Sequence, residues 1–416
     1  MILEYTCENY RSIKEKVVFS MLASKDNSFE NLLIDYRGIP VNKVAAFYGA
    51  NGSGKTSFLD SLHFLKMLVC NSNNHQPGDK IRQVSHKLSE QNSPTSYTIQ
   101  FVKNDVRYAY GLSYKPEQIE SEYLYYFPNG KQAKIFDRRL NKISFGDKFK
   151  KDFEAILNFM KPNKLFLSVS ANYSSVKDAE LVFLFFREDI IFYPQPIEIN
   201  NWLEYSIERF TKESGLKNLF IDFMRSVETP IQSIDTTFEK TKMSPEFVPD
   251  NIPDEIKPFF AQAKEVTRTE ANIDYGLFSV NLNDESKGIQ KLFEVFGPII
   301  DIILKDKILV WDEMETSLHP KIVKEILRLI MYGKNNSKAQ LIFSTHDTNL
   351  LDLNTFRRDQ IWFTELNESR ATDIYSLAEL KNVRKDENIS KGYMKGKYGA
   401  IPFIHNPLIF PVEEEC

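Results

Sequence analysis

Nine residues at positions 49–57, Gly-Ala-Asn-Gly-Ser-Gly-Lys-Thr-Ser, match every fixed position of the P-loop pattern G-x-x-x-x-G-K-[ST]. The glycines let the backbone turn tightly, so its N–H groups can point at phosphate oxygens. Lys55 is placed to reach the β- and γ-phosphates, and Thr56 offers a hydroxyl to Mg²⁺. The expected nucleotide-binding residues are Gly49, Ala50, Asn51, Gly52, Ser53, Gly54, Lys55, Thr56 and Ser57.

The residues on both sides of this loop support the same interpretation. Positions 44–48 form an apolar run typical of a buried strand, and positions 57–69 carry apolar residues at helical spacing. A loop that joins a strand to a helix places the helix N-terminus, with its partial positive charge, against the anion. The sequence therefore predicts binding of a nucleotide with Mg²⁺.

Composition limits the remaining possibilities. The chain has 416 residues, too many for one simple core, which predicts two or three lobes. No apolar run approaches the roughly twenty residues of a membrane span, and the first residues lack the features of a secretion signal. Three cysteines without a CxxC pattern fit a reducing compartment, so we expect a cytoplasmic protein. The net charge of −4 restricts any nucleic-acid contact to a local basic patch.

The chain divides by pattern into three parts. Residues 1–145 combine the P-loop elements with alternating strands that predict an antiparallel meander. Residues 146–269 contain segments of helical spacing separated by prolines and predict a helical insert, whose last expected helix covers 255–264. Residues 270–416 return to strands alternating with helices. The predicted class is α/β, with a mostly parallel sheet continuous with the P-loop strand.

Two further strands end in residues suited to phosphate chemistry. The apolar run 308–311 ends in Asp312-Glu313, the arrangement of a Walker B motif. Asp312 would hold Mg²⁺, and Glu313 would act as the base or orient the attacking water. The run 340–343 leads to His346, which could donate a hydrogen bond to the γ-phosphate or the water. An isolated histidine there could be purely structural, but the order and spacing favour the catalytic role.

Two candidates leave more than one interpretation open. Ser286 and Gly288 precede an apolar helix that begins near Leu292, and a helix N-terminus of this kind can bind an anion. Ser286 could equally be a plain N-cap. Arg11, between two expected strands, could lie near the nucleotide or be a solvated turn residue.

The order of these motifs resembles the ABC-type ATPases of the SMC and RecF class. It is most similar to the RloA-type or AbiL-like bacterial ATPases, which include the ATPase subunit of the PARIS anti-phage system and are related to the ATPase half of OLD-family nucleases. The resemblance extends over both ends of the chain. It rests on residues 9–14, 285–288, 311–313, 318–320, 343–347, 357–363, 384–388, 392–393 and 397–402.

The resemblance implies a head-to-head homodimer with two ATP molecules between the subunits. Ser286 and Gly288 would then act on the nucleotide of the other subunit, although Lys287 and Ile289 depart from the family's Leu-Ser-Gly-Gly-Gln signature. No glutamine has the context of the family's Q-loop; the candidates are Gln83 and Gln100. The 70 residues after His346 resemble the family's own tail, so we expect no nuclease domain there.

The function expected from this resemblance is a slow ATPase that acts as a sensor or switch. It would control a separate effector, a toxin or nuclease from the same operon, in anti-phage defence. The alternatives are a RecF-like ATPase that acts on DNA ends and a scaffold that binds ATP without useful turnover. Basic stretches at 131–151 and 381–397 are most simply solvated faces, but either could contact a nucleic acid or a protein partner.

Overall fold

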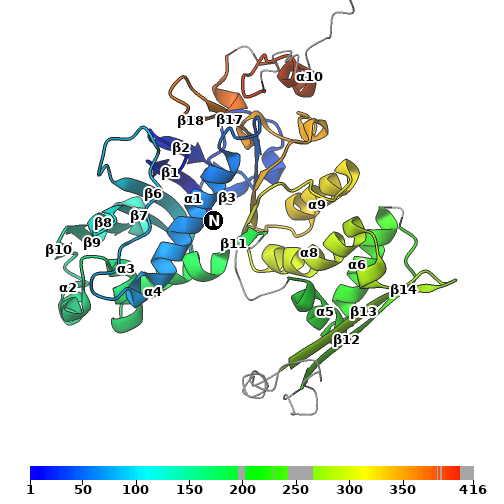
Figure 1. Cartoon of the computed structure of the whole chain (residues 1–416), viewed down its shortest axis with the longest axis horizontal. Coiled ribbons are helices and arrows are strands. Elements are labelled where there is room, and N and C mark those ends of the chain that lie inside the picture. Colours follow the sequence, from blue (N-terminus) through cyan, green and yellow to red (C-terminus); the bar gives the residue numbers. More distant parts are fainter. Residues whose placement is uncertain (195–201, 228, 242–265, 382, 385–386, 403–416) are drawn as a thin grey trace, which may run out of the picture. The chain divides into compact units, whose positions relative to one another are not determined.

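The computed structural model describes residues 1–194, 202–227, 229–241, 266–381, 383–384 and 387–402. The chain forms two compact units (Figure 1). The first unit comprises Met1–Pro194, Asp306–Met314 and Ile330–Cys416, and the second comprises Gln195–Lys305 and Glu315–Leu329. The first unit is therefore assembled from stretches that lie far apart in the sequence.

The first unit contains a six-stranded sheet in the order β11-β15-β16-β5-β17-β18. Its strands from β11 to β17 are parallel, and β18 runs antiparallel to β17. The central strands are apolar throughout and buried on both faces, as expected for a parallel sheet. The bounds are β5 (Val44–Tyr48), β11 (Ile190–Tyr193), β15 (Ile308–Trp311), β16 (Gln340–Ser344), β17 (Ile361–Leu366) and β18 (Thr372–Ser376).

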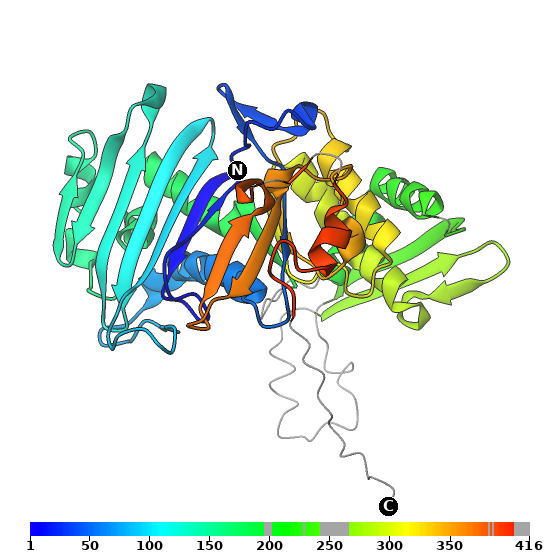
Figure 2. The ribbon, with the colours of Figure 1, turned by 90° about the horizontal axis from the view of Figure 1, so that it is seen from above.

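The first unit also contains a seven-stranded antiparallel sheet, in the order β10-β9-β8-β7-β6-β1-β2 (Figure 2). The predicted antiparallel meander is confirmed. The bounds are β1 (Ile2–Glu8), β2 (Val17–Ser20), β6 (Thr95–Lys103), β7 (Val106–Lys115), β8 (Gln118–Tyr126), β9 (Ala133–Arg139) and β10 (Lys142–Phe145). A short hairpin, β3 (Ile34–Tyr36) and β4 (Ile39–Val41), precedes β5.

Helix α1 (Lys55–Asn71) packs against both sheets. Phe58 of α1 lies 4.9 Å from Phe47 of β5 and 5.5 Å from Phe19 of β2, measured between ring centroids. Trp362 of β17 lies 5.0 Å from Phe19 in the same way. All four side chains belong to one buried apolar cluster, so the helix after the P-loop is fixed to both sheets by the hydrophobic core.

Residues 146–194 belong to the first unit, whereas the sequence analysis placed them in a helical insert. They contain α2 (Lys150–Glu154), α3 (Phe166–Tyr173) and α4 (Lys177–Leu184), followed by β11. The buried carboxylate of Glu122 on β8 accepts hydrogen bonds from the backbone N–H groups of Phe166 (2.6 Å) and Leu167 (2.9 Å). Burial raises the pKa of Glu122. This carboxylate therefore anchors the start of α3 to the antiparallel sheet.

The second unit contains α5 (Trp202–Lys212), α6 (Ser214–Ser226), α8 (Lys287–Leu304) and most of α9 (Pro320–Tyr332). Its core includes Phe210, Phe220 and Phe293 from three different helices, with ring centroids 4.9–5.5 Å apart. A three-stranded antiparallel sheet accompanies these helices. Its strands are β12 (Ser233–Thr241), β13 (Val266–Asp274) and β14 (Ser279–Asn281).

The prediction of a helical insert at 146–269 is therefore wrong in two places. Residues 190–193 form β11 of the six-stranded sheet, and β12 with the start of β13 forms a long hairpin-like pair. In both cases long-range pairing decides the structure, which local spacing does not reveal. The predicted helix at 255–264 lies outside the described residues. Among those that are described, no helix has the length and apolarity that crossing a membrane requires.

The described part of the C-terminal tail packs on the six-stranded sheet instead of forming only a basic surface. Tyr393 of α10 (Ile389–Met394) is buried, with its ring centroid 6.2 Å from that of Tyr48 and 5.6 Å from that of Phe363. The backbone N–H of Ala400 donates to the carboxylate of Glu365 at 2.8 Å. The tail thus contacts the strand that leads directly into the P-loop.

Candidate nucleotide-binding site

Three neighbouring parallel strands end at the same edge of the six-stranded sheet. Phe343 of β16 pairs with Trp311 of β15 on one side and with Ala46 of β5 on the other. Because the strands are parallel and in register, the residues that follow them emerge together. The P-loop follows β5, Asp312 follows β15, and His346 follows β16. The structure therefore brings the three predicted motifs to one edge.

The P-loop has the conformation that an anion site requires. Gly54 caps α1 with φ of +109°, and a Cβ atom there would lie 2.1 Å from the hydroxyl oxygen of Thr372. Only glycine fits both the left-handed backbone and this close approach. Ser53 and Lys55 are buried, whereas Asn51, Gly52 and Thr56 are exposed. The first turn of α1 consequently presents its N–H groups and the hydroxyl of Thr56.

Lys55 lies inside the loop. Its ammonium donates to the carbonyl oxygens of Gly49 (2.8 Å) and Ala50 (3.1 Å). The buried ammonium of Lys55 is held by loop carbonyls, in the place where the N–H groups of the loop would bind phosphate oxygens. This is the position from which the predicted contact to the β- and γ-phosphates can be made.

Hydroxyl groups from distant elements hold the loop in place. Ser53 Oγ lies 2.6 Å from Thr364 Oγ1 of β17. Thr372 Oγ1 of β18 donates to the carbonyl oxygen of Ser53 at 3.0 Å and lies 2.8 Å from Ser12 Oγ. The sequence analysis did not identify Ser12, Thr364 or Thr372, and only Ser12 lies in a motif that it singled out.

The acidic pair after β15 is oriented by Ser344. The hydroxyl of Ser344 donates to Asp312 Oδ1 and accepts a hydrogen bond from the backbone N–H of Glu313 at 2.8 Å. Asp312 is partly buried, whereas Glu313 is exposed and has φ of +51°. A left-handed backbone is uncommon for glutamate and is often found at functional sites. Ser344 was part of a quoted motif but received no role in the sequence analysis.

His346 is exposed at the end of β16. The preceding residue, Thr345, is buried and donates its backbone N–H to the carbonyl oxygen of Phe47 at 3.0 Å. The histidine therefore leaves the sheet beside the strand that enters the P-loop. This position suits the predicted hydrogen bond to a phosphate or to the attacking water.

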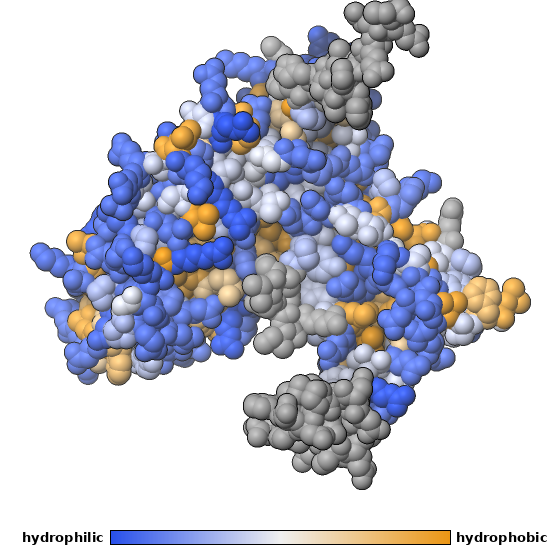
Figure 3. All heavy atoms as spheres, in the orientation of Figure 1, coloured by the Kyte–Doolittle hydropathy of each residue, from blue (hydrophilic) through white to orange (hydrophobic). Residues whose placement is uncertain are grey.

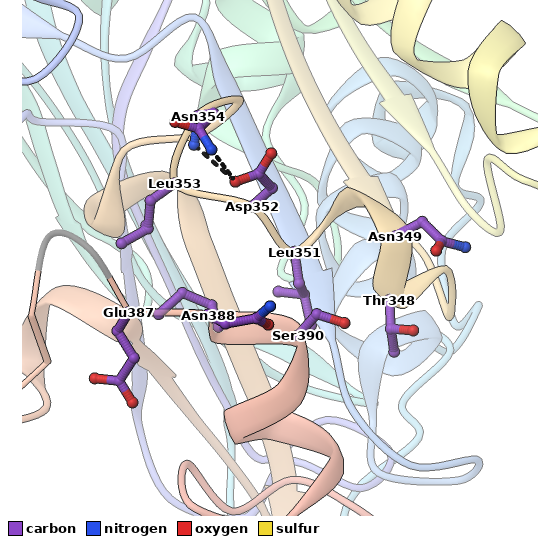
Figure 4. A pocket seen from close by; sticks show the side chains of 10 residues that line it. Thr348, Asn349, Leu351, Asp352, Leu353, Asn354, Glu387, Asn388 and Ser390 are labelled. Atoms are coloured by element: carbon purple, nitrogen blue, oxygen red, sulfur yellow. Dashed lines mark hydrogen bonds between the residues drawn. The ribbon is translucent and has the colours of Figure 1, made fainter.

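The loop after His346 forms one side of a polar pocket of about 430 Å³ (Figure 4). Asp352 accepts hydrogen bonds from the backbone and side chain of Asn354, both at 2.9 Å, and this keeps the loop compact. The other side of the pocket comes from residues 387–390, at the start of α10. The residues that follow the histidine and the tail thus share one cavity.

Arg11 lies beside α1 and is not a free turn residue. Its guanidinium is 2.9 Å from the carboxylate of Asp60, which also accepts a hydrogen bond from Tyr10 at 2.5 Å. Asp60 lies five residues after Lys55 on the same helix. Burial and the hydrogen bond to Asp60 raise the pKa of Tyr10. The arginine is therefore positioned along the helix that leaves the P-loop, next to Ser12.

The sequence profile of one protein family matches residues 44–352, which include the P-loop, the Walker B pair and His346. That family is described as "AAA domain, putative AbiEii toxin, Type IV TA system". The chain belongs to this family. It is an ABC-like P-loop ATPase of the AbiL- and RloA-like kind, as the resemblance implied. The mixed α/β architecture confirms the predicted P-loop NTPase fold.

Several solved structures are similar at low identity. One is the SMC head bound to the C-winged helix domain of ScpA, with 14% identity, a TM-score of 0.43 and coverage of 90% of this chain and 97% of that one. Another is the SMC head domain from Thermotoga maritima, with 12% identity, a TM-score of 0.40 and coverage of 90% and 98%. No curated protein matches the sequence. The family assignment rests on the profile match and the motifs.

The signature-like residues of this AAA-domain protein lie in the second unit. Ser286 caps α8, and its hydroxyl accepts from the backbone N–H of Ile289 at 3.4 Å, so the N-cap interpretation holds. Ser286 is also exposed. Gly288 lies against the carbonyl oxygen of Ser317, which would be 3.1 Å from a Cβ atom. The cap and a further contact with an anion are compatible.

The two candidates for a Q-loop glutamine have other partners. The amide of Gln83 donates to the carbonyl oxygen of Ser93 and the hydroxyl of Thr95, at 3.0 and 3.1 Å. Gln100 lies on β6, where its side chain bonds to Arg107 at 2.8 Å. Neither glutamine is assigned to the site.

The residues at the sheet edge fit a nucleotide with Mg²⁺. The exposed hydroxyl of Thr56 and the carboxylate of Asp312 are hard oxygen donors, the type that Mg²⁺ prefers alongside phosphate oxygens and water. Within the described residues no group of three or more His, Cys, Asp or Glu side chains forms a separate metal cluster. Two protein ligands are the usual number where Mg²⁺ also binds the phosphates of its substrate.

Proposed function

We propose that this protein binds and hydrolyses ATP at the edge formed by β5, β16 and β15. The observation that carries the proposal is the convergence of the P-loop, Asp312-Glu313 and His346 on three adjacent parallel strand ends in one unit. A chance collection of such residues would have no reason to share one edge. The family to which the chain belongs supports nucleotide use.

Each residue has a role that follows from its position. The N–H groups of the loop and Lys55 bind the phosphates. Thr56 and Asp312 would hold Mg²⁺, which offsets charge that develops on the phosphate oxygens. Glu313 orients and deprotonates the attacking water, with Ser344 fixing its backbone. His346 donates to the γ-phosphate or to that water.

We further propose that ATP joins two copies head to head, with Ser286 and Gly288 of one copy completing the site of the other. Ser286 is exposed at the N-terminus of an 18-residue helix, where the helix dipole favours an anion. The resemblance to SMC- and RecF-class ATPases supports this arrangement. ATP binding then closes the dimer and hydrolysis opens it, in the cytoplasm.

The output of this switch is proposed to be a separate effector in anti-phage defence, a toxin or nuclease from the same operon. The family description names a toxin and a type IV toxin–antitoxin system, and the resemblance to defence ATPases points the same way. The candidate docking surfaces are the second unit and the pocket shared by the tail and the loop after His346. One side of this pocket begins at Thr348, two residues after His346, so an occupant there would contact the loop that leaves the site.

The experiment combines enzymology with affinity purification. The purified chain should hydrolyse ATP, leave plasmid, linear DNA and tRNA intact in Mg²⁺ or Mn²⁺, and co-purify with a product of its own operon. Lys55→Ala serves as the control that lacks ATP binding. Nucleic-acid cleavage that persists in Lys55→Ala and co-elutes with the protein in size-exclusion chromatography would contradict the proposal that a separate effector carries the destructive activity.

A second candidate function, an ATPase that acts on DNA ends, draws on the basic stretch at 131–151. Arg139 and Lys148 in this stretch are largely exposed, and their contacts to carboxylates are long, at 4.0 and 3.9 Å. DNA binding through this surface should weaken steeply with salt, because phosphate contacts release counterions. Salt-sensitive binding to DNA ends that stimulates turnover would favour this candidate over the defence switch.

A further inference from the structure

The turn between β13 and β14 exposes two large apolar side chains side by side. Leu277 is 95% exposed and Phe278 is 59% exposed. The surface of the molecule shows an apolar patch at this end of the three-stranded sheet (Figure 3). Tight turns usually carry Gly, Asn, Asp or Ser at their tips, so an exposed Leu-Phe pair is not explained by turn formation.

The turn is held in one shape. The backbone N–H of Tyr275 donates to the carbonyl oxygen of Phe278 at 2.9 Å, and that of Gly276 donates to Asp274 Oδ1 at 2.8 Å. Gly276 has φ of +86°, which fits the first central position of a two-residue hairpin turn. Leu277 is therefore presented on a fixed backbone, so a contact made by it loses little conformational entropy.

The same turn is connected to the signature-like segment. Tyr275 packs on Phe278, with ring centroids 5.3 Å apart, and its hydroxyl donates to Glu285 Oε1 at 2.7 Å. The other oxygen of Glu285 accepts from the backbone N–H of Ser286 at 3.2 Å. One side chain thus lies between the apolar tip and the residue that caps α8. A protein surface that contacts the exposed Ser286 would therefore also contact the Leu277–Phe278 turn.

The first unit also carries an exposed apolar residue, in the loop that precedes β6. Leu88 is 61% exposed. Its loop is fixed by Asn9 Oδ1, which accepts from the backbone N–H of His86 (3.1 Å) and the hydroxyl of Ser89 (2.7 Å). In the same region, the backbone N–H of Arg11 donates to the carbonyl oxygen of Val84 at 2.6 Å. The Leu88 loop is therefore attached to the segment of Asn9 and Arg11. The next residue, Ser12, lies 2.8 Å from the Thr372 hydroxyl that also donates to the Ser53 carbonyl oxygen of the P-loop.

We infer that Leu277 and Phe278 of one copy pack on the Leu88 loop of a second copy when ATP joins them. This inference rests on the proposed head-to-head dimer, which places the signature segment of one copy against the P-loop edge of the other. The occupant is a second copy because the chain itself supplies both apolar surfaces. One is connected through Tyr275 and Glu285 to Ser286, and the other through residues 9–12 and Thr372 to the P-loop. The contact adds a hydrophobic anchor next to a polar, nucleotide-mediated interface.

The experiment measures ATP-dependent dimerisation in the Glu313→Gln background by analytical ultracentrifugation. Leu277→Ser with Phe278→Ser should weaken the dimer at least about tenfold, because buried anchors dominate interface energies. ATP binding by the monomer and its circular dichroism should not change. The matched control is Leu140→Ser, which alters another exposed apolar hairpin tip, 45% exposed, on the β9–β10 turn.

The outcomes separate this inference from the function on which it rests. If Glu313→Gln forms no dimer with ATP, both fail together. If it dimerises and the double substitution changes the affinity less than about twofold, the hairpin contact alone is overturned. A second measurement uses Leu88→Cys and Leu277→Cys with Cys70 and Cys416 replaced by serine. ATP should promote a crosslink between copies for this pair, and equal crosslinking without ATP would contradict the inference.

Discussion

The nucleotide edge of the first unit and the signature-like segment of the second unit are built in opposite ways. At the nucleotide edge, Ser53, Asp312 and Glu313 are each held by hydrogen bonds from other strands. At the signature-like segment, the hydroxyl of Ser286 has one long cap bond of 3.4 Å and faces solvent. The nucleotide edge is held in position by hydrogen bonds within the first unit. The signature-like segment is an exposed surface whose hydroxyl group has few protein contacts.

This difference indicates that the two regions contribute to different steps, nucleotide binding and ATP hydrolysis. A loop with its cation and acidic pair already positioned can bind a nucleotide without help. An exposed helix N-terminus gains only a weak interaction with an anion in water and becomes effective when the approach of another surface excludes solvent. The comparison predicts that binding belongs to a single copy and that rapid turnover requires two.

Removal of the loop cation should have the largest effect. Lys55→Ala removes a buried ammonium that would bond to phosphate oxygens, and we expect ATP affinity to fall at least about 10²-fold. Isothermal titration calorimetry measures this directly. The control is Lys66→Ala on the same helix. Lys66 donates to the Ile190 carbonyl oxygen, away from the loop, so this variant should bind ATP normally. If Lys55→Ala bound ATP with unchanged affinity and had a native circular dichroism spectrum, the P-loop would not be the ATP-binding site.

Loss of the catalytic carboxylate should come next. Glu313→Gln keeps the size of the side chain but cannot accept a proton, so turnover should fall at least about 10²-fold while ATP still binds. A phosphate-release assay beside a binding measurement separates the two effects. Glu325→Gln on α9, whose carboxylate pairs with Arg328, is the matched control. Full activity in Glu313→Gln would place the general base elsewhere.

A smaller effect should follow from the residue that orients the acidic pair. Ser344→Ala removes the hydroxyl that bonds to both Asp312 and the backbone of Glu313, and we expect turnover to fall about tenfold. Because Asp312 would hold Mg²⁺, the variant should also need more Mg²⁺ for half-maximal activity. A purely structural role would lower the melting temperature without shifting that Mg²⁺ requirement.

The nucleotide edge was predictable from the sequence because its residues form contiguous motifs. The P-loop and Asp312-Glu313 each follow an apolar strand, and parallel strands end together. The supporting hydroxyls were not predictable, since Thr364 and Thr372 lie more than 300 residues from Ser53 and approach it only through the sheet order. Sheet order depends on long-range pairing, which local spacing does not encode.

The boundaries of the second unit show the same limit. Residues 190–193 were predicted to lie within the helical insert, yet they pair with β15 at the edge of the parallel sheet. The apolar tip at Leu277 and Phe278 also gave no signal, because a short apolar pair within a strand-rich stretch resembles core. For Ser286 the sequence left two interpretations open, and the structure establishes the N-cap.

The most direct test of a catalytic site shared between two copies is complementation between two inactive variants. Ser286→Arg keeps an intact P-loop, and Lys55→Ala keeps an intact signature segment. Each alone should hydrolyse ATP at no more than a few per cent of the wild-type rate. A mixed dimer has one site in which the P-loop of the first variant meets the signature of the second, so mixing should restore measurable turnover. Normal turnover by Ser286→Arg alone, or no recovery on mixing, would contradict a site shared between two copies.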